Sequence, residues 1–338
     1  MVALSALPGV GDVTIARQLA ECGSAEAVLL RYPLSAREAA VAVADAVLVS
    51  ARRIGARVLI GADTDYPARL NELHDSPAVL FARGTIAAAE PPAVAIVGTR
   101  MASNYGIRVA RAIATACARA GATVVSGLAR GIDGAAHEAA LAAGGRTVAI
   151  LGTGLDVYYP RSHRSLQENI ARDGLLLSEL SPGASGHSGT FPRRNRIIAA
   201  LADVTVVVEA GHGSGALITA DQAIELGRIV ACVPNAIDVA GAAGSNALLK
   251  RNAEPVLCAD DVLALLDLRA APSAQPILDD DAASCWDAVQ HGAPDVASIT
   301  RVTRLSMRCV ATALSALELE GLVFIDADGR VRSTITSA

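Results

Sequence analysis

The middle of the chain, from about residue 93 to 251, alternates short apolar runs with longer alanine-rich segments of helical pattern. The apolar runs have strand length and lack polar alternation, which is typical of parallel strands buried on both faces. Strands alternating with helices of this length predict an α/β domain with a Rossmann-like parallel sheet. We expect strands at 93–98, 122–126, 146–151, 174–178, 203–209 and 228–233. We expect helices near 104–120, 131–143, 163–172, 194–201, 215–226 and 244–251.

The first 62 residues have a helical pattern and form a predicted small helical domain. The turn at 7–11, of sequence LPGVG, resembles a helix-hairpin-helix, in which backbone N–H groups at a helix start can bind a phosphate. An ordinary tight turn between helices is the alternative, and we favour it. A connector with a short strand at 76–84 follows, and we assign it with the Rossmann-like core as one domain, 63–268.

The end of the chain changes character twice. Residues 269–283 are small, proline-containing and acidic, which predicts a linker. Residues 284–338 then show a helix, a short helix, a longer helix and a glycine-bounded ribbon, an order that predicts a winged-helix domain. This domain has more acidic than basic side chains, so the sequence gives little support for DNA binding by it.

Composition narrows the possible partners. The formal net charge is -5, so any binding of an anion must come from local positive sites rather than from a general polycation. The six cysteines form no C-x-x-C pair, which excludes common zinc spacings and gives no disulfide framework. No apolar stretch is long enough to span a bilayer, and there is no signal peptide pattern. We expect a cytoplasmic protein without membrane contact, metal or cofactor.

Two strand ends carry candidate binding residues. Gly98, Thr99 and Arg100 follow the first predicted strand of the core, and Ser126, Gly127 and Arg130 lie at the second. Parallel sheets bind ligands where their strands end and helix N-termini point outward, so both junctions predict anion binding. The alternative for Arg100 is a structural pair with a carboxylate. The dinucleotide fingerprint G-x-G-x-x-G is absent.

The segment 190–201, TFPRRNRIIAAL, concentrates positive charge in an acidic chain. An aromatic ring beside guanidinium groups suits a strand that has phosphates to neutralise and bases to stack. The alternative is a helix start in which the polar side chains are solvated. Its candidate DNA-binding residues are Phe191, Arg193, Arg194, Asn195 and Arg196.

Catalytic chemistry has weaker support. His212 and Ser214 lie close in sequence, but no matched nucleophile, base and orienting group accompanies them. His137, inside a predicted helix, fits a structural histidine better than a site residue. We therefore expect no catalytic residues.

Several segments together resemble the DNA-processing protein A family (DprA, also called Smf), in one collinear order over about 65–258. They are DYPARL (65–70), SPAVLFARG (76–84), AIVGTRMASNYG (95–106), VSGLARGIDGAAH (125–137), LGTGLDVYYPRSHR (151–164), LLSELSPG (176–183), FPRRNRIIAAL (191–201) and VVEAGHGSGALITADQAIELGR (207–228). The resemblance implies a helical domain similar to a sterile alpha motif, an extended Rossmann core and a C-terminal winged helix. It implies a homodimer that binds single-stranded DNA and loads RecA during natural transformation and DNA recombination. By this likeness Arg100 and the segment 191–196 match strand-binding residues.

Two other function classes stay open. One is a Rossmann-like enzyme that hydrolyses nucleotide N-glycosidic bonds, for which Glu209 at the end of its strand is the best candidate acid. The other is a DNA-linked regulator that acts through the winged helix.

Overall fold

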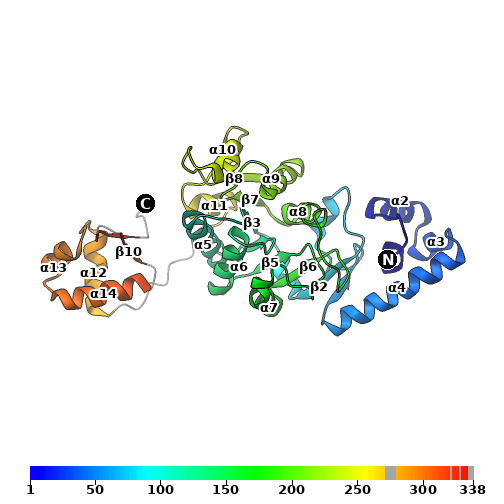
Figure 1. The fold of residues 1–338 in the computed structure, drawn as a ribbon, viewed down its shortest axis with the longest axis horizontal. Coiled ribbons are helices and arrows are strands. Elements are labelled where there is room, and N and C mark those ends of the chain that lie inside the picture. The colour runs from blue at the N-terminus through cyan, green and yellow to red at the C-terminus, as the bar shows by residue number, and fades with distance from the viewer. Residues whose placement is uncertain (271–278, 320–321, 327–328, 334–338) are drawn as a thin grey trace. The chain divides into compact units, whose positions relative to one another are not determined.

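The computed structural model describes residues 1–270, 279–319, 322–326 and 329–333. The chain divides into two compact units, Met1–Ala271 and Pro272–Ala338. Figure 1 shows the fold and the element labels used below.

The first unit is built on a nine-stranded sheet in the order β1-β2-β6-β5-β4-β3-β7-β8-β9. The seven strands from β6 to β9 in that order run parallel, whereas β2 is antiparallel to β6 and β1 is antiparallel to β2. The strands are β1 (Arg57–Leu59), β2 (Leu80–Gly84), β3 (Ala93–Val97), β4 (Thr123–Ser126), β5 (Thr147–Ile150), β6 (Leu175–Ser178), β7 (Val204–Val207), β8 (Ile229–Cys232) and β9 (Glu254–Pro255). The α/β fold and the six predicted parallel strands are confirmed.

Helices cover both faces of this sheet, as the continuously apolar strands require. On one face lie α5 (Asn104–Arg119), α6 (Ile132–Ala142), α7 (Arg164–Asp173) and α11 (Ala259–Leu265). On the other lie α8 (Thr190–Leu201), α9 (Gly215–Glu225) and α10 (Ala243–Leu249). Short 3-10 turns occur at η1 (Ala68–Glu72), η2 (Ile86–Ala89), η3 (Arg161–His163) and η4 (Ala240–Ala242).

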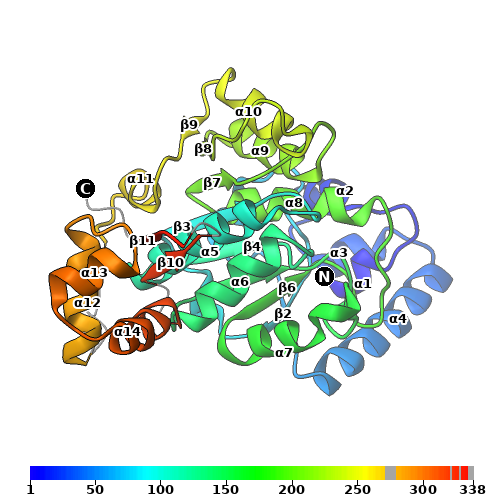
Figure 2. The ribbon, with the colours of Figure 1, turned by 60° about the vertical axis from the view of Figure 1, so that its left-hand side comes forward.

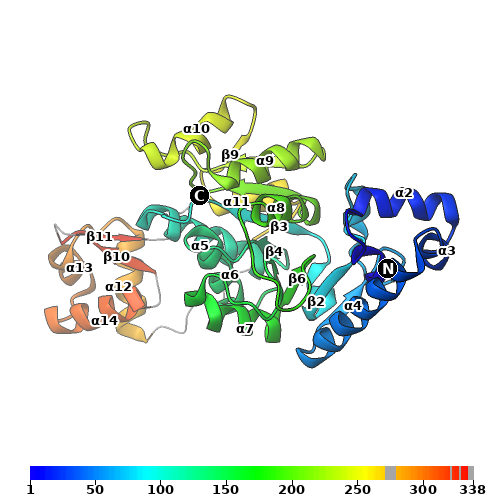
Figure 3. The same cartoon turned by 45° about the vertical axis from the view of Figure 1, so that its right-hand side comes forward.

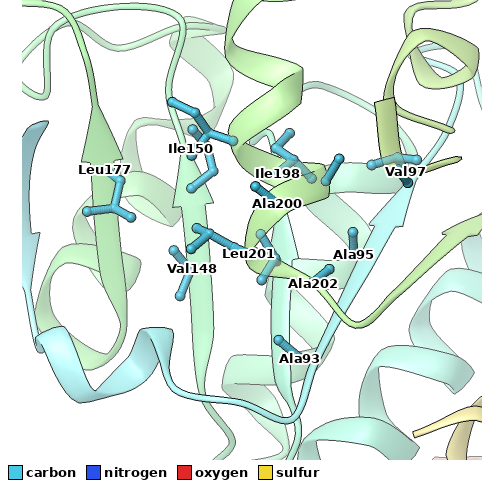
Figure 4. Close-up of a cluster of buried hydrophobic side chains, with 14 of the residues drawn as sticks. Ala93, Ala95, Val97, Val148, Ile150, Leu177, Ile198, Ala200, Leu201 and Ala202 are labelled. Atoms are coloured by element: carbon cyan, nitrogen blue, oxygen red, sulfur yellow. The ribbon is translucent and has the colours of Figure 1, made fainter. Parts of the chain in front are cut away.

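The alternation of side chains along each strand divides the core into two layers. In β3, Ala93, Ala95 and Val97 face α8, while Val94 and Ile96 face α5 and α6. Figure 4 shows the first layer, in which the apolar end of α8 lies over β3 and β5. Ala93 and Ala95 of β3 and Ala199, Ala200 and Ala202 at this end of the helix are among the small residues of the layer.

Helix α8 begins at Thr190, four residues before the expected start. Pro192 lies in its first turn, where backbone N–H groups have no partner inside the helix and a proline costs no hydrogen bond. The polar segment that begins with Thr190 and Phe191 is therefore helical as well.

The N-terminal residues form four helices, as the pattern predicted. They are α1 (Val2–Ser5), α2 (Asp12–Cys22), α3 (Ala25–Leu30) and α4 (Leu34–Arg53), and Figure 3 shows α2, α3 and α4 grouped together. They share an apolar cluster built on Leu4, Ile15 and Val28. The last turn of α4 packs on the sheet through Ala51.

The described residues of the second unit form three helices and a two-stranded ribbon. Figure 2 shows these elements. They are α12 (Asp280–Gln290), α13 (Val296–Thr303), α14 (Met307–Leu319), β10 (Val323–Ile325) and β11 (Val331–Ser333). This order confirms the winged helix. The predicted linker 269–283 falls in part, at 271–278, outside the described residues. Its end is helical rather than extended, because Asp279 caps α12 by accepting a hydrogen bond from the Ala282 N–H.

The order of the strands creates one switch point. From β3 the chain adds β4, β5 and β6 on one side, then returns to place β7 on the other side of β3. The connections after β3 and β7 therefore diverge, and open α/β sheets bind ligands in the crevice that results. Within the described residues, no helix combines the length and the apolar character needed to cross a membrane.

Deleting residues 284–338 should leave the first unit folded with an unchanged melting temperature. Among the described residues, the apolar cluster of the second unit begins at Ala282 and shares no member with the clusters of the first unit, so each unit has its own core. Circular dichroism during heating measures the result. A truncated chain that aggregates or melts at a clearly lower temperature would contradict this independence.

Candidate nucleic-acid interface

A cavity of about 570 Å³ opens at the switch point. The ends of β3 and β7 and the start of α8 enclose it. Six of the candidate residues predicted from the sequence line it. They are Gly98, Thr99 and Arg100 at the end of β3, and Phe191, Arg194 and Asn195 of α8. The cavity therefore brings together two motifs that are about ninety positions apart in the chain.

The end of β3 contributes a glycine without room for a side chain and an arginine without an ion pair among the described residues. A side chain at Gly98 would meet the Ile132 side chain at 2.5 Å, so only glycine fits there. The Thr99 N–H donates to the Glu209 carbonyl at 2.7 Å and ties this turn to the end of β7. The Arg100 guanidinium is exposed and has no ion pair within the described part of the chain. The structural-pair alternative for Arg100 thus has no carboxylate to support it.

The end of β4 is mostly internal. Ser126 is fully buried and its Oγ donates to the Ile96 carbonyl at 2.6 Å. Gly127 is buried against the Arg194 guanidinium, which leaves no room for a side chain. Arg130 is exposed without a carboxylate partner among the described residues, and it lines a neighbouring cavity instead of the first one. Of these three residues, Arg130 alone could reach a phosphate directly.

Phe191 stands at the start of α8, half-buried at the cavity wall. The Arg100 Cζ lies 5.6 Å from the centre of its ring, within the range of a cation–π contact. The ring of Tyr159 lies on it with centroids 5.0 Å apart. A side chain at Gly152 would meet the Phe191 ring at 2.6 Å, so the ring rests directly on this backbone.

Arg194 is an internal residue with a structural role. Its Nη1 donates to the Gly127 carbonyl at 2.7 Å and to the Ile150 carbonyl, the ends of β4 and β5. Burial lowers the pKa of Arg194 to about 10, while the nearby Asp133 carboxylate favours its charged form. The guanidinium thus joins α8 to two strand ends.

The rest of the arginine cluster is also engaged within the protein. Asn195 Nδ2 donates to the Gly215 carbonyl at 3.1 Å, and Arg196 is 6 % exposed. Arg196 pairs with Glu179 at 2.6 Å and with Asp75 at 2.8 Å. Arg193 is exposed but pairs with Asp12 of α2. The segment is a helix start, as the alternative had it, but Arg194, Asn195 and Arg196 are buried rather than solvated. Phe191 lines the cavity, and its binding of DNA stays a prediction.

Sequence reasoning did not include the loop after β7 in the site. Residues 211–215, of sequence GHGSG, line the same cavity as Arg100. The glycines of this loop follow a strand, just as Gly98 does. A glycine after a strand therefore marks both segments, but only the placement of β7 beside β3 shows that they line one cavity. Ser214 caps α9 by accepting from the Ala216 N–H, so it is engaged as a helix cap.

The acid that the enzyme hypothesis requires is also engaged. Glu209 is 3 % exposed, and its Oε2 accepts from the Ser103 N–H at 3.1 Å and from the Ser103 Oγ at 2.7 Å. Ser103 in turn caps α5. Glu209 thus holds the start of a helix. Within the described residues, no group of histidine, cysteine and acidic side chains could hold a metal ion.

A mostly parallel sheet with a glycine-lined cavity at its switch point places this chain among the doubly wound α/β proteins, which bind their ligands at that edge of the sheet. The family described as DNA recombination-mediator protein A matches residues 57–267, and the DprA winged helix domain matches residues 269–329. The chain therefore belongs to this DprA family, as the resemblance indicated.

Relatives and solved structures agree with this assignment. Protein Smf of Synechocystis is 45% identical over 64% of this chain and 54% of its own length, so the chain spans about half of that relative. The DNA processing protein DprA of Bacillus subtilis is 36% identical over 68% of this chain and 78% of its own. The X-ray structure of Streptococcus pneumoniae DprA superposes with a TM-score of 0.70 at 36% identity, covering 78% of this chain and 95% of that one. A Helicobacter pylori DprA structure, described for its unique single-stranded DNA binding mode, gives 0.57 at 30% identity over 63% and 97%.

His137 is a core histidine, as the sequence favoured. It is fully buried in α6, and its Nδ1 lies 2.7 Å from the Thr147 Oγ1. Burial, followed by the Arg194 and His163 charges, lowers the pKa of His137 to about 3.

This histidine should make the fold sensitive to acid. The pKa of His137 is lower in the folded protein than in the unfolded chain, so the unfolded chain binds a proton first as pH falls. The free energy of unfolding is therefore unaffected by His137 above about pH 6.5 and decreases as pH falls from there toward 3. At pH 5 the loss is about 2 kcal/mol. Urea unfolding at pH 7 and pH 5 measures it, with His137→Gln as the variant that should lack this part of the pH dependence. An equal pH dependence in both proteins would contradict the account.

Proposed function

We propose that this protein binds single-stranded DNA in the cavity at the switch point and helps load RecA on it during natural transformation. The binding of single strands is supported by the site and by the Helicobacter pylori relative, whose structure is described for its single-stranded DNA binding mode. The RecA step and the homodimer rest on the family resemblance, and the cytoplasmic location is an expectation from the sequence pattern.

The pairing of Arg100 with Phe191 carries the proposal. An unpaired guanidinium attracts a phosphate, and a half-buried ring offers a face to a base. An exposed arginine or a surface aromatic ring is common by itself. Here the Arg100 Cζ lies 5.6 Å from the centre of the Phe191 ring, and both residues line one cavity. Successive phosphates and bases of a flexible strand can use both, whereas the bases of a duplex are stacked on each other.

The direct test compares single- and double-stranded DNA of equal length by fluorescence anisotropy across a salt series. We expect tighter binding to the single strand with little dependence on sequence, because every base has a π-face. Equal affinity for the two forms would overturn the proposal. A RecA filament assay on the same strand tests the loading step separately.

We propose that the activity is binding and not catalysis. The Glu209 carboxylate is held by Ser103, and so it is not directed at a sugar–base bond in the cavity. Incubation of the purified protein with nucleotides, followed by chromatography for released bases, tests this. Release that disappears in Glu209→Gln would favour the hydrolase.

Replacing Arg100 with alanine should weaken binding strongly and flatten its salt dependence. Each phosphate neutralised contributes about 0.7 to the log–log slope for single strands. Anisotropy over a salt series measures the slope. Arg119→Ala is the matched control, because Arg119 is exposed in the last turn of α5, at the opposite edge of the sheet. An unchanged slope in a folded Arg100 variant would make Arg100 structural.

Replacing Phe191 with alanine should cost roughly 1–3 kcal/mol of binding free energy, as expected for a base-stacking ring. Phe191→Leu keeps apolar bulk against Gly152 but removes the ring, so it should bind nearly as weakly. If Phe191 only fills space, both variants would bind single strands as the unchanged protein does, and the alanine variant alone would melt at a lower temperature.

A further inference from the structure

A second cavity, of about 460 Å³, is also lined by Arg100. It shares Arg100 and Ala129 with the first cavity. Arg130, Tyr159 and Arg161 also line it. A ligand that occupies both cavities would contact Arg100, which lines both.

The charges of this second cavity are free. Arg100, Arg130 and Arg161 have no ion pair within the described part of the chain, although most other arginines of the first unit near the sheet are paired. Three unneutralised guanidinium groups around one hollow attract an anion, and a phosphate is the anion that a nucleic-acid strand supplies.

The two neighbouring tyrosines differ in what they do. The Tyr158 hydroxyl donates to Glu168 at 2.8 Å, and the Arg164 guanidinium lies over its ring at 4.9 Å. Glu168 also holds Arg83, so Tyr158 belongs to an internal polar network. Tyr159 is 48% exposed, and its hydroxyl makes no hydrogen bond to any described residue. Its one ring contact is with Phe191, at 5.0 Å with the planes inclined by 35°.

An exposed ring that lies next to a base-stacking ring, in a hollow with free arginines, has the properties of a second stacking platform. We propose that Tyr159 and the second cavity bind the next nucleotide of the strand, with its base on Tyr159 and its phosphate between Arg130 and Arg161. The strand then passes from the ring of Phe191 to the neighbouring ring of Tyr159. This proposal rests on the proposed function, since it extends the same DNA-binding surface.

The test uses oligothymidylates of increasing length with Tyr159→Ala and Tyr159→Phe. The alanine variant should lose roughly 5- to 140-fold in affinity for strands long enough to fill both cavities, corresponding to one stacked base. The phenylalanine variant should bind normally, because stacking needs the ring and not the hydroxyl. Tyr105→Ala is the matched control, since Tyr105 is an exposed tyrosine outside both cavities.

Strand length separates a platform from a support for Phe191. If Tyr159 only holds Phe191 in place, its removal would weaken all lengths by the same factor, and the second subsite would be refuted. Photocrosslinking of a bromouracil strand gives an independent measurement, and we expect the adduct on Tyr159. Full affinity of Tyr159→Ala for long strands, together with losses in Arg100→Ala and Phe191→Ala, would refute the subsite and leave the proposed function standing. A protein that binds no single strand would refute both.

Discussion

The buried guanidinium of Arg194 is the interaction on which the site depends. It donates from the first turns of α8 to the carbonyl groups that end β4 and β5. Removing a charge from water costs several kcal/mol unless other interactions replace the lost hydration. The two carbonyls replace it in part by accepting from Nη1, and the nearby Asp133 carboxylate favours the charged guanidinium. These hydrogen bonds fix the start of α8 against the edge of the sheet where the cavity lies. Phe191, three residues earlier, is thereby placed on Gly152 and beside Arg100.

The positive residues of the chain are therefore divided between two tasks. Arg194 and Arg196 are buried and hold α8, the first through strand carbonyls and the second through Glu179 and Asp75. Arg100 and Arg130 are exposed, come from strand ends, and have no carboxylate partner among the described residues. Such a division reconciles an acidic chain with the binding of an anion, since a few unpaired groups focused at one edge can attract a strand.

The sequence predicted the fold well because continuous apolar strands and alternating helices leave few arrangements. It could not predict that β2 joins the sheet antiparallel to β6, since a single short apolar strand does not reveal its direction. It grouped Arg193, Arg194, Asn195 and Arg196 as one binding cluster, because adjacency in sequence does not show which side of a helix is buried. The contribution of the loop at 211–215 depended on β7 lying beside β3, which is a property of the topology and not of any motif.

The most direct test of the central claim is a double-mutant cycle between Arg194 and Phe191, with affinity for single-stranded DNA as the measured quantity. Arg194→Met removes the hydrogen bonds to the strand ends and keeps an apolar side chain of similar length. If Arg194 acts by positioning Phe191, the folded Arg194→Met protein already lacks most of the stacking contribution, and adding Phe191→Ala should weaken binding little further. Full additivity of the two losses would contradict the account, because it would mean that Phe191 reaches the strand without the buried arginine.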